Sequence, residues 1–187
     1  MLTDGRIFQM PMKTVSRCAA FTLIEMLTTV AGLVIVLGLM VSLARYVRSR
    51  SADALTRDIL QKLDVWYKTA SGDQAVEARL NAVPRLMGPG EPHPDDAALQ
   101  MAAMANNEAF VRACLDSGGG AALLKFPLSV YDGRTLRDAW GTPLVYMAPN
   151  AANPGLSPQK RAFFFSAGPD HRFGTVSDNL YSYEVAR

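Results

Sequence analysis

The sequence has few of the residues that build catalytic or metal centres. Its two cysteines, Cys18 and Cys114, lie far apart among 187 residues, and no C-x-x-C or Cys/His spacing of a zinc site occurs. The two histidines, His93 and His171, are equally distant from each other. There is no G-x-S-x-G, no phosphate-binding glycine loop and no nucleophile beside a candidate base. The sequence therefore does not predict an enzyme.

An excess of charge of one sign is also lacking. The formal net charge is only +2, and the basic residues are spread along the chain, so we expect no nucleic-acid partner. Hydrophobic residues make up 49%, and part of that content is concentrated in a single run. What remains has the composition of a soluble protein, which predicts one modest domain joined to one membrane segment.

The hydrophobic run covers residues 21–44, FTLIEMLTTVAGLVIVLGLMVSLA, and contains one charge, Glu25. About 20 apolar residues are enough to cross a bilayer. A carboxylate in such a segment costs roughly 2.5–3.5 kcal/mol on insertion scales, so a segment that retains one has a use for it. The alternative is that Glu25 lies near the helix start and extends its carboxylate to the membrane surface.

A basic segment, residues 1–20, precedes the run, and such segments stay in the cytoplasm. It is either the disordered tail of an uncleaved anchor or a leader that a peptidase removes. Ser42 and Ala44 offer only a weak small-x-small match for ordinary signal peptidase, and the run is long for a signal peptide. The segment's charges are Arg6, Lys13 and Arg17 against Asp4.

Residues 20–27, Ala-Phe-Thr-Leu-Ile-Glu-Met-Leu, resemble the N-terminal motif of type IV pilins and type II secretion pseudopilins. The resemblance implies that a prepilin peptidase cuts between Ala20 and Phe21 and then methylates the amine of Phe21. The chain departs from the family at Ala20, where the family has glycine. The resemblance also implies that Glu25 pairs with the amine of a neighbouring subunit. An unpaired buried charge is destabilising, so such pairing would select the axial register.

The apolar run is expected to continue as one long helix. Residues 44–70 contain no proline and no glycine, and their apolar positions recur at helical spacing. We predict a helix from Phe21 to about Lys68, roughly 45–50 residues and on the order of 70 Å long. Its second half, residues 45–70, is amphipathic and should pack on the rest of the chain. The predicted apolar face consists of Leu55, Ile59, Leu63 and Trp66.

Two more helices are predicted in the middle of the chain. Residues 73–83 form a short one that ends at Pro84. Residues 96–117 form a longer one that allows a break at Asn106-Asn107 and ends at three glycines. In the loop before it, Asp95 or Asp96 caps the helix, or joins His93 at a metal ion. The apolar face of the longer helix would be Phe110, Val111, Cys114 and Leu115.

From Ala121 onward the sequence predicts strands. The candidates are residues 142–148, 161–166 and 180–185, and Asp132-Gly133 marks a turn. They predict a small antiparallel sheet with one face on the second half of the long helix. Together with the helices, this arrangement is an α+β fold.

Two C-terminal motifs resemble the major pseudopilin of type II secretion. They are Asp138-Ala-Trp140-Gly141-Thr-Pro143 and the loop that runs from Ser166-Ala-Gly168-Pro-Asp170 to Asp178-Asn179. The resemblance implies that this loop binds one calcium ion through Asp170 and Asp178, with Asn179 and Ser177 as further ligands. Arg172 would oppose a cation if it pointed inward. The alternative is a hairpin loop closed by hydrogen bonds to its own backbone. Trp140 is expected to anchor the core, beside local hydrogen bonds of Asp138.

Taken together, the resemblance predicts a type IV pilin-like fold: a long N-terminal helix, transmembrane in its first half, packed on a small antiparallel sheet. The expected parts are a cytoplasmic leader (1–20), a transmembrane and filament-core half-helix (21–44), an amphipathic half-helix (45–70) and a periplasmic domain (71–187). The implied function is a structural, non-enzymatic subunit that polymerises into the pseudopilus of type II secretion. The implied partners are other copies, minor pseudopilins, prepilin peptidase and an inner-membrane assembly platform.

Two other functions remain open. The first is a type IV pilin or minor pilin for adhesion, motility or DNA uptake. Major pilins often carry a C-terminal disulfide loop, and a chain cut after Ala20 would retain one cysteine only. The second is a periplasmic binding protein or enzyme with an uncleaved single-pass anchor.

Overall fold

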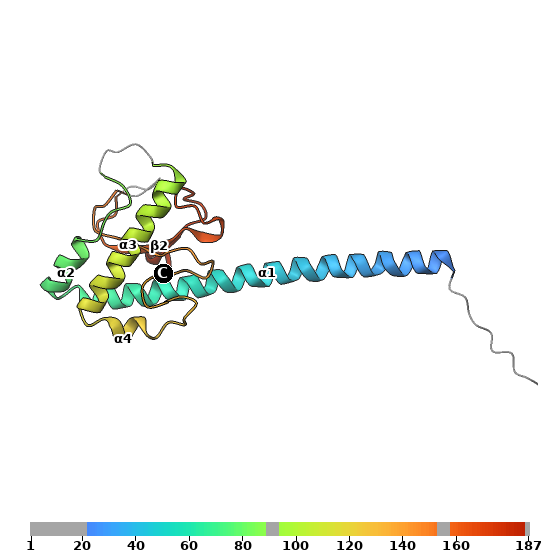
Figure 1. Cartoon of the computed structure of the whole chain (residues 1–187), viewed down its shortest axis with the longest axis horizontal. Helices are drawn as coiled ribbons and strands as arrows, with labels where there is room; N and C mark the ends of the chain where they lie inside the picture. Colours follow the sequence, from blue (N-terminus) through green and yellow to red (C-terminus); the bar gives the residue numbers. More distant parts are fainter. Residues whose placement is uncertain (1–21, 89–93, 153–157, 186–187) are drawn as a thin grey trace, which may run out of the picture. The chain divides into compact units, whose positions relative to one another are not determined.

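The computed structural model describes residues 22–88, 94–152 and 158–185. It divides into two compact units, Met1–Leu43 and Ala44–Arg187, and each is described by itself. The helix α1, Leu23–Ala70, contributes to both (Figure 1). It is long and apolar enough to span a membrane: its most apolar 18-residue window has a mean hydropathy of 2.4, with no residue buried. The predicted uninterrupted helix is confirmed.

Local interactions explain the extent of α1. Three ion pairs at (i, i+4) spacing join Asp53 to Arg57, Asp58 to Lys62 and Asp64 to Lys68, a geometry that supports helices. The helix ends at Ala70, as predicted before Ser71 and Gly72, and the Ser71 amide donates to the carbonyl of Tyr67.

The buried face of α1 is displaced from the predicted one. Ile59 and Leu63 are buried as expected, but Leu55 is 39% exposed and Trp66 is only partly buried. Thr56 and Leu60 are fully buried beside them. The hydroxyl of Thr56 accepts a hydrogen bond from the backbone amide of Ala139 at 3.2 Å, so a polar residue occupies the centre of the packed face.

Helices α2, Gln74–Asn81, and α3, Asp96–Asp116, agree with the predicted ranges. Their N-caps are Asp73 and Asp95, whose side chains accept from the amides of Ala75 and Ala98. Two details differ from the prediction. Leu115 is 45% exposed rather than part of the core, and the short helix α4, Gly120–Leu123, replaces the expected start of the strands.

Asn106 and Asn107 do not break α3. Both are buried and use their side-chain amides as hydrogen-bond partners for backbone groups. Asn106 accepts from the amide of Tyr146 at 2.9 Å and donates to its carbonyl at 2.8 Å. It thereby occupies the open edge of a strand, which would otherwise expose unpaired backbone groups.

The sheet has three antiparallel strands in the order β1-β2-β3 (Figure 1). Strands β1, Val145–Met147, and β2, Phe163–Ser166, pair with Val145 opposite Phe165. Strand β3, Leu180–Tyr181, is shorter than predicted, because residues 182–185 form the helix α5, Ser182–Val185. The hydroxyl of Ser182 accepts from the amide of Phe164, so a side chain takes the place of the next ladder bond.

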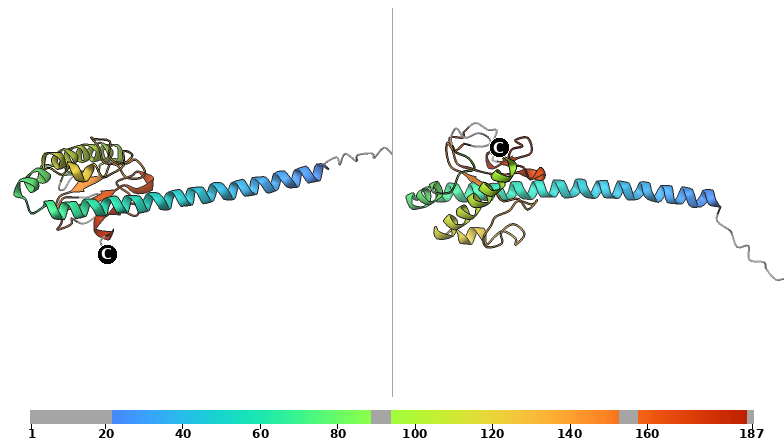
Figure 2. Two further views of the ribbon diagram at one scale, coloured as in Figure 1. Left: turned by 90° about the horizontal axis from the view of Figure 1, so that it is seen from below. Right: turned by 45° about the horizontal axis from the view of Figure 1, so that its top comes forward.

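Both faces of the sheet are buried. Tyr146 and Phe164 pack with Ile59, Leu60 and Phe110 in a core cluster that includes the second half of α1. Val145, Phe163, Phe165 and Tyr181 belong to a second cluster, which includes Leu99 and Ala103 of α3. In the left view of Figure 2, the strands lie between α3 and the second half of α1. The α+β class and the packing of the amphipathic half-helix on the sheet are confirmed.

Candidate functional site

Glu25 lies in the first turn of α1, where it takes part in the helix N-cap. Its backbone amide donates to the Thr22 hydroxyl at 3.3 Å, and that hydroxyl lies 3.5 Å from the Glu25 carboxylate. The Thr22 hydroxyl thus caps the first turn by accepting from the Glu25 amide, which is one half of a capping box. The T-x-x-E spacing in the sequence is the signal that could have indicated this cap. Ala20 and Phe21, on either side of the predicted cleavage point, lie outside the described residues.

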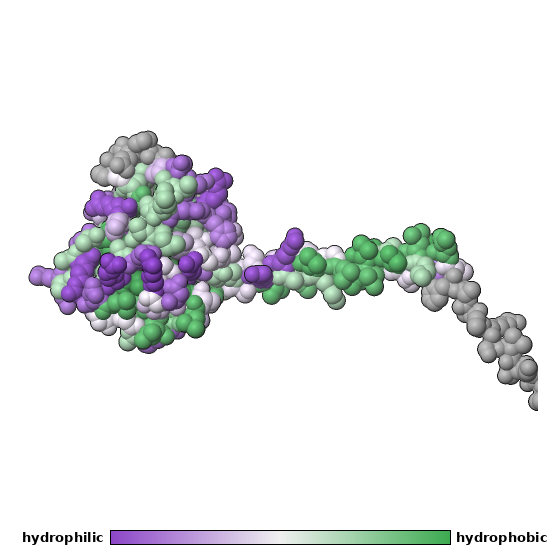
Figure 3. Space-filling model, in the orientation of Figure 1, coloured by the Kyte–Doolittle hydropathy of each residue, from purple (hydrophilic) through white to green (hydrophobic). Residues whose placement is uncertain are grey.

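The remaining surface of α1 up to Leu43 is mainly apolar and exposed. Thr28 and Thr29 direct their hydroxyls to the carbonyl of Glu25, at 3.0 and 2.9 Å. Every large hydrophobic side chain between Leu23 and Leu43 is more than half exposed, and Figure 3 shows this continuous hydrophobic surface on the helix. A surface of this kind needs lipid or other helices to cover it.

The loop between β2 and β3 closes on itself at a glycine. It begins with the 3₁₀ turn η1, Gly168–Asp170. Gly168 has φ +72°, and a β-carbon there would lie 2.1 Å from the backbone oxygen of Asp178. The two ends of the loop therefore meet, which brings the segment of Asp170 next to that of Asp178.

The loop offers oxygen ligands of the kind that calcium prefers. Asn179 is 5% exposed, and its side-chain oxygen is buried without a hydrogen-bond partner. Asp170 accepts one bond, from the Arg172 amide, and Asp178 accepts one from Ser177 at 3.4 Å. The Arg172 guanidinium pairs with Asp96 of α3, which neutralises its charge. Carboxylate, amide and hydroxyl oxygens thus fit a hard cation.

The acidic content of the loop is nonetheless low. Among the described residues, no group of three or more His, Cys, Asp or Glu side chains gathers around one point. A cation in the loop would take the rest of its ligands from amide, hydroxyl and backbone oxygens and from water. The alternative metal cluster around His93 cannot be assessed, since His93 lies outside the described residues; Asp95 is the helix cap.

Asp138 joins the two C-terminal motifs. Its carboxylate accepts from the amides of Trp140 and Thr142 at 2.9 and 2.8 Å, and from the hydroxyl of Ser166 at 2.6 Å. Burial raises its pKa above the ordinary range, while these hydrogen bonds oppose the rise. The Ser166 hydroxyl in turn accepts from the Gly168 amide at 3.0 Å. Asp138 therefore positions the start of the loop, beyond the local role predicted for it. Trp140 is partly buried and packs against the core cluster from its margin, in line with the predicted anchor.

Cys114 is fully buried, and desolvation raises the pKa of its thiol well above the usual value. A thiol in this environment packs as a small hydrophobic group rather than reacting. This agrees with its predicted place in the core of α3.

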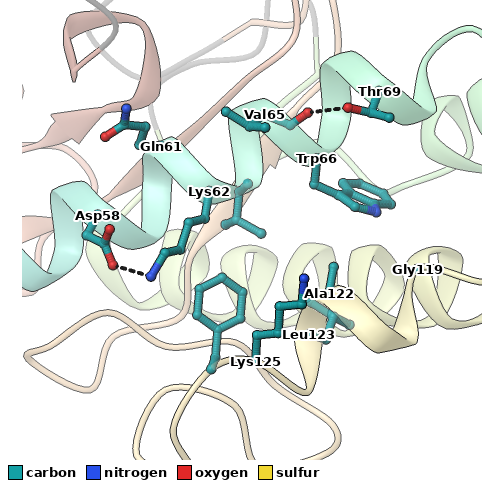
Figure 4. Close-up of a pocket in the computed structure, with 12 residues that line it drawn as sticks. Asp58, Gln61, Lys62, Val65, Trp66, Thr69, Gly119, Ala122, Leu123 and Lys125 are labelled. Atoms are coloured by element: carbon teal, nitrogen blue, oxygen red, sulfur yellow. Dashed lines mark hydrogen bonds and ion pairs between the residues drawn. The ribbon is translucent and has the colours of Figure 1, made fainter.

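An apolar groove of about 660 Å³ lies between the second half of α1 and the segment that contains α4 (Figure 4). Leu63, Trp66 and Leu123 line it. Two of its polar side chains are paired within α1: Lys62 donates to Asp58 at 2.6 Å, and Thr69 donates to the carbonyl of Val65. Gln61 and Lys125 also line it.

Comparison of the chain with protein-family models, with curated proteins and with solved structures finds no match.

Proposed function

We propose that this chain is a pilin-like subunit, anchored in the inner membrane as a precursor, that polymerises into the pseudopilus of a type II secretion system. The observation that carries the proposal is the composition of α1. Its first half is an exposed apolar helix whose one carboxylate, Glu25, lies in the first turn. Its second half is the helix on which the α+β domain packs. Such a helix suits two successive environments, a bilayer and the core of a filament.

Glu25 has a specific role under this proposal. After a cut before Phe21, the new amine carries a positive charge close to the Glu25 carboxylate of an adjacent subunit. Removing one partner of a buried ion pair costs about 3–5 kcal/mol, because the other charge is left uncompensated. The pair would therefore select the stacking register of the apolar helices. The hydrogen bonds to the Thr22 hydroxyl hold Glu25 within the first turn without using up its charge.

The leader and the processing step complete the proposal. A prepilin peptidase would remove residues 1–20 and methylate Phe21, and an inner-membrane platform with minor pseudopilins would start assembly. The C-terminal domain would lie in the periplasm. The calcium loop favours the secretion branch over type IV pili, since the loop resemblance is to the major pseudopilin.

Assembly should depend on the charge of Glu25 and not on its capping role. We expect Glu25→Gln, which keeps an acceptor for the Thr22 hydroxyl but removes the charge, to be processed normally yet to reduce cross-linked oligomers in inner membranes about 100-fold or more. Glu25→Ala should behave alike. The first readout is the intact mass after co-expression with prepilin peptidase, which should show the loss of residues 1–20 and the gain of one methyl group. The second is the ladder of cross-linked oligomers on a denaturing gel.

Thr29→Val is the matched control. The Thr29 hydroxyl bonds only to carbonyls of its own helix, so this variant should be processed and cross-linked like the wild type. A chain that retains Met1 in the presence of the peptidase would argue for an uncleaved anchor. Oligomers that survive in Glu25→Gln but not in Glu25→Ala would assign the effect to helix capping and reject the charge pair.

Calcium should stabilise the domain through the β2–β3 loop. We propose that Asp170, Asp178, Asn179 and Ser177 supply side-chain oxygens to the ion. A ligand that binds the folded state at 100 times its Kd adds about 2.7 kcal/mol, so millimolar calcium should raise the Tm by several degrees and a chelator should reverse the rise. Asp178→Asn should weaken this response, whereas Asp58→Asn on α1 should not. A Tm that changes with neither calcium nor chelator would reject the calcium site and favour the alternative, a loop closed by hydrogen bonds alone.

A further inference from the structure

A second groove has a volume of about 640 Å³. It lies between residues 45–55 of α1 and the two C-terminal motifs. From α1 it is lined by Arg45, Arg48 and Ser51 among others, and from the loops by Trp140, Pro169 and His171. All of its residues belong to the unit Ala44–Arg187. Nothing in the pseudopilus proposal uses this groove.

The groove is positively charged and has no acidic lining residue. Among the described residues, neither Arg45 nor Arg48 has a carboxylate within ion-pair distance, whereas Arg57, further along α1, is paired with Asp53. Two guanidinium groups in one groove without a carboxylate provide donors suited to a phosphate, which arginine binds in a bidentate fashion.

The loop side adds a polar and an aromatic group. The Nδ1 atom of His171 lies 2.6 Å from the Thr142 hydroxyl. When Thr142 donates this bond, the hydrogen of the imidazole is on Nε2, where it can be donated to an anion. The indole of Trp140 is half-buried at the groove, and tryptophan is enriched where a protein meets the lipid headgroup region.

The position of the arginines in the sequence identifies the source of the phosphate. Arg45 directly follows the apolar run of residues 21–44, so the helical turns that carry Arg45 and Arg48 lie within roughly 6 Å of its end at 1.5 Å per residue. Lipid phosphates occupy this level of a bilayer.

We propose that this groove binds the phosphate of an anionic phospholipid headgroup, with Arg45 and Arg48 as the main ligands and His171 and Trp140 beside them. The inference extends beyond filament formation and requires only that residues 21–44 are embedded in a membrane. Each direct hydrogen bond from a guanidinium to the phosphate raises the affinity at least about fivefold, so we expect losing both arginines to lower it roughly 25-fold or more.

The test uses the full chain with fluorinated tryptophan in nanodiscs. Its two tryptophans should give two ¹⁹F resonances, and Trp66, which lies in the apolar groove, provides an internal reference. Raising the phosphatidylglycerol content of phosphatidylcholine discs should shift the Trp140 resonance and leave that of Trp66 in place. Arg45→Gln with Arg48→Gln should increase the phosphatidylglycerol fraction needed for half of the shift roughly 25-fold, or abolish the shift within the accessible range.

Arg50→Gln is the matched control. The guanidinium carbon of Arg50 lies 5.0 Å from the centre of the Tyr46 ring, and Arg50 does not line the groove. Its loss should therefore change the phosphatidylglycerol fraction at half of the Trp140 shift less than twofold. An Arg50→Gln effect equal to that of Arg45→Gln would indicate general surface attraction and overturn the site. A second arm titrates glycerol 3-phosphate into phosphatidylcholine discs. A saturable Trp140 shift there that needs Arg45 and Arg48 would support the phosphate site but assign it to a soluble phosphate. No Trp140 shift in either arm would reject the proposal.

Discussion

Replacing Asn107 by leucine is expected to destabilise the α+β domain by about 2–6 kcal/mol, because two buried backbone groups would lose their partners at about 1–3 kcal/mol each. Asn107 is fully buried. Its amide nitrogen donates to the carbonyls of Leu136 and Leu144 at 2.7 and 2.6 Å, and its oxygen accepts from the Leu136 amide at 2.9 Å. Leucine retains a similar volume but would leave the Leu136 amide and the Leu144 carbonyl unpaired.

The measurement is thermal melting of the full chain in detergent, where we expect the Tm to fall by roughly 10 °C. Asn107→Asp gives a sharper result, since it keeps the acceptor and loses both donors. It should destabilise at least as much as leucine, because it places a carboxylate against two carbonyl oxygens in the core.

Asn81→Leu is the control for the asparagine-to-leucine change itself. Asn81 is exposed at the end of α2, so its replacement should change the stability by no more than about 0.5 kcal/mol. A Tm of Asn107→Leu equal to that of Asn81→Leu would mean that α3 does not depend on this hydrogen-bonded edge.

The part of the fold that the sequence predicted is the part that depends on local pattern. Residues 44–70 lack proline and glycine, and this predicted that α1 continues past the apolar run. An aspartate before the longer apolar repeat, Asp95 or Asp96, predicted the start of α3 through capping, and Asp95 is the N-cap. Strands β1 and β2 fall inside predicted apolar stretches.

The predictions failed where a polar side chain makes its hydrogen bond to a residue far away in the sequence. Asn106 and Asn107 have weak helix propensity, because an asparagine side chain competes for hydrogen bonds with the backbone of its own helix. In α3 these side chains bond instead to the backbone of β1 and of the segment beside it. Thr56 is polar, so periodicity placed it outside the packed face, yet it bonds to Ala139. Ser182 ends β3 early by capping Phe164. None of these partners is adjacent in the sequence.

The candidate sites show the same division. The apolar run and Glu25 could be read from the sequence, since charge and hydropathy are local. The phosphate groove could not, because Arg45 and His171 are brought to one groove only by packing. The dependence of the β2–β3 loop on Gly168 is visible only in the structure, where Asp178 lies against it.

Gly168→Ala should therefore have the second large effect, a loss of about 2–5 kcal/mol of stability. Two costs add. An alanine at φ +72° occupies the left-handed region, at about 1–2 kcal/mol. Its β-carbon would also lie 2.1 Å from the Asp178 backbone oxygen, and such overpacking costs about 1–3 kcal/mol. Because the obstacle is backbone, no side-chain rotation can relieve it.

Gly133→Ala separates the two costs. Gly133 has φ +92°, but a β-carbon there meets no atom within 4 Å, so this variant should lose only the backbone term of about 1–2 kcal/mol. The difference in Tm between the two variants measures the close approach of Gly168 to Asp178. Equal losses would mean that the loop ends do not meet. The calcium response gives a second readout: if closure at Gly168 aligns Asp170 with Asp178, Gly168→Ala should lose it, whereas Gly133→Ala should keep it.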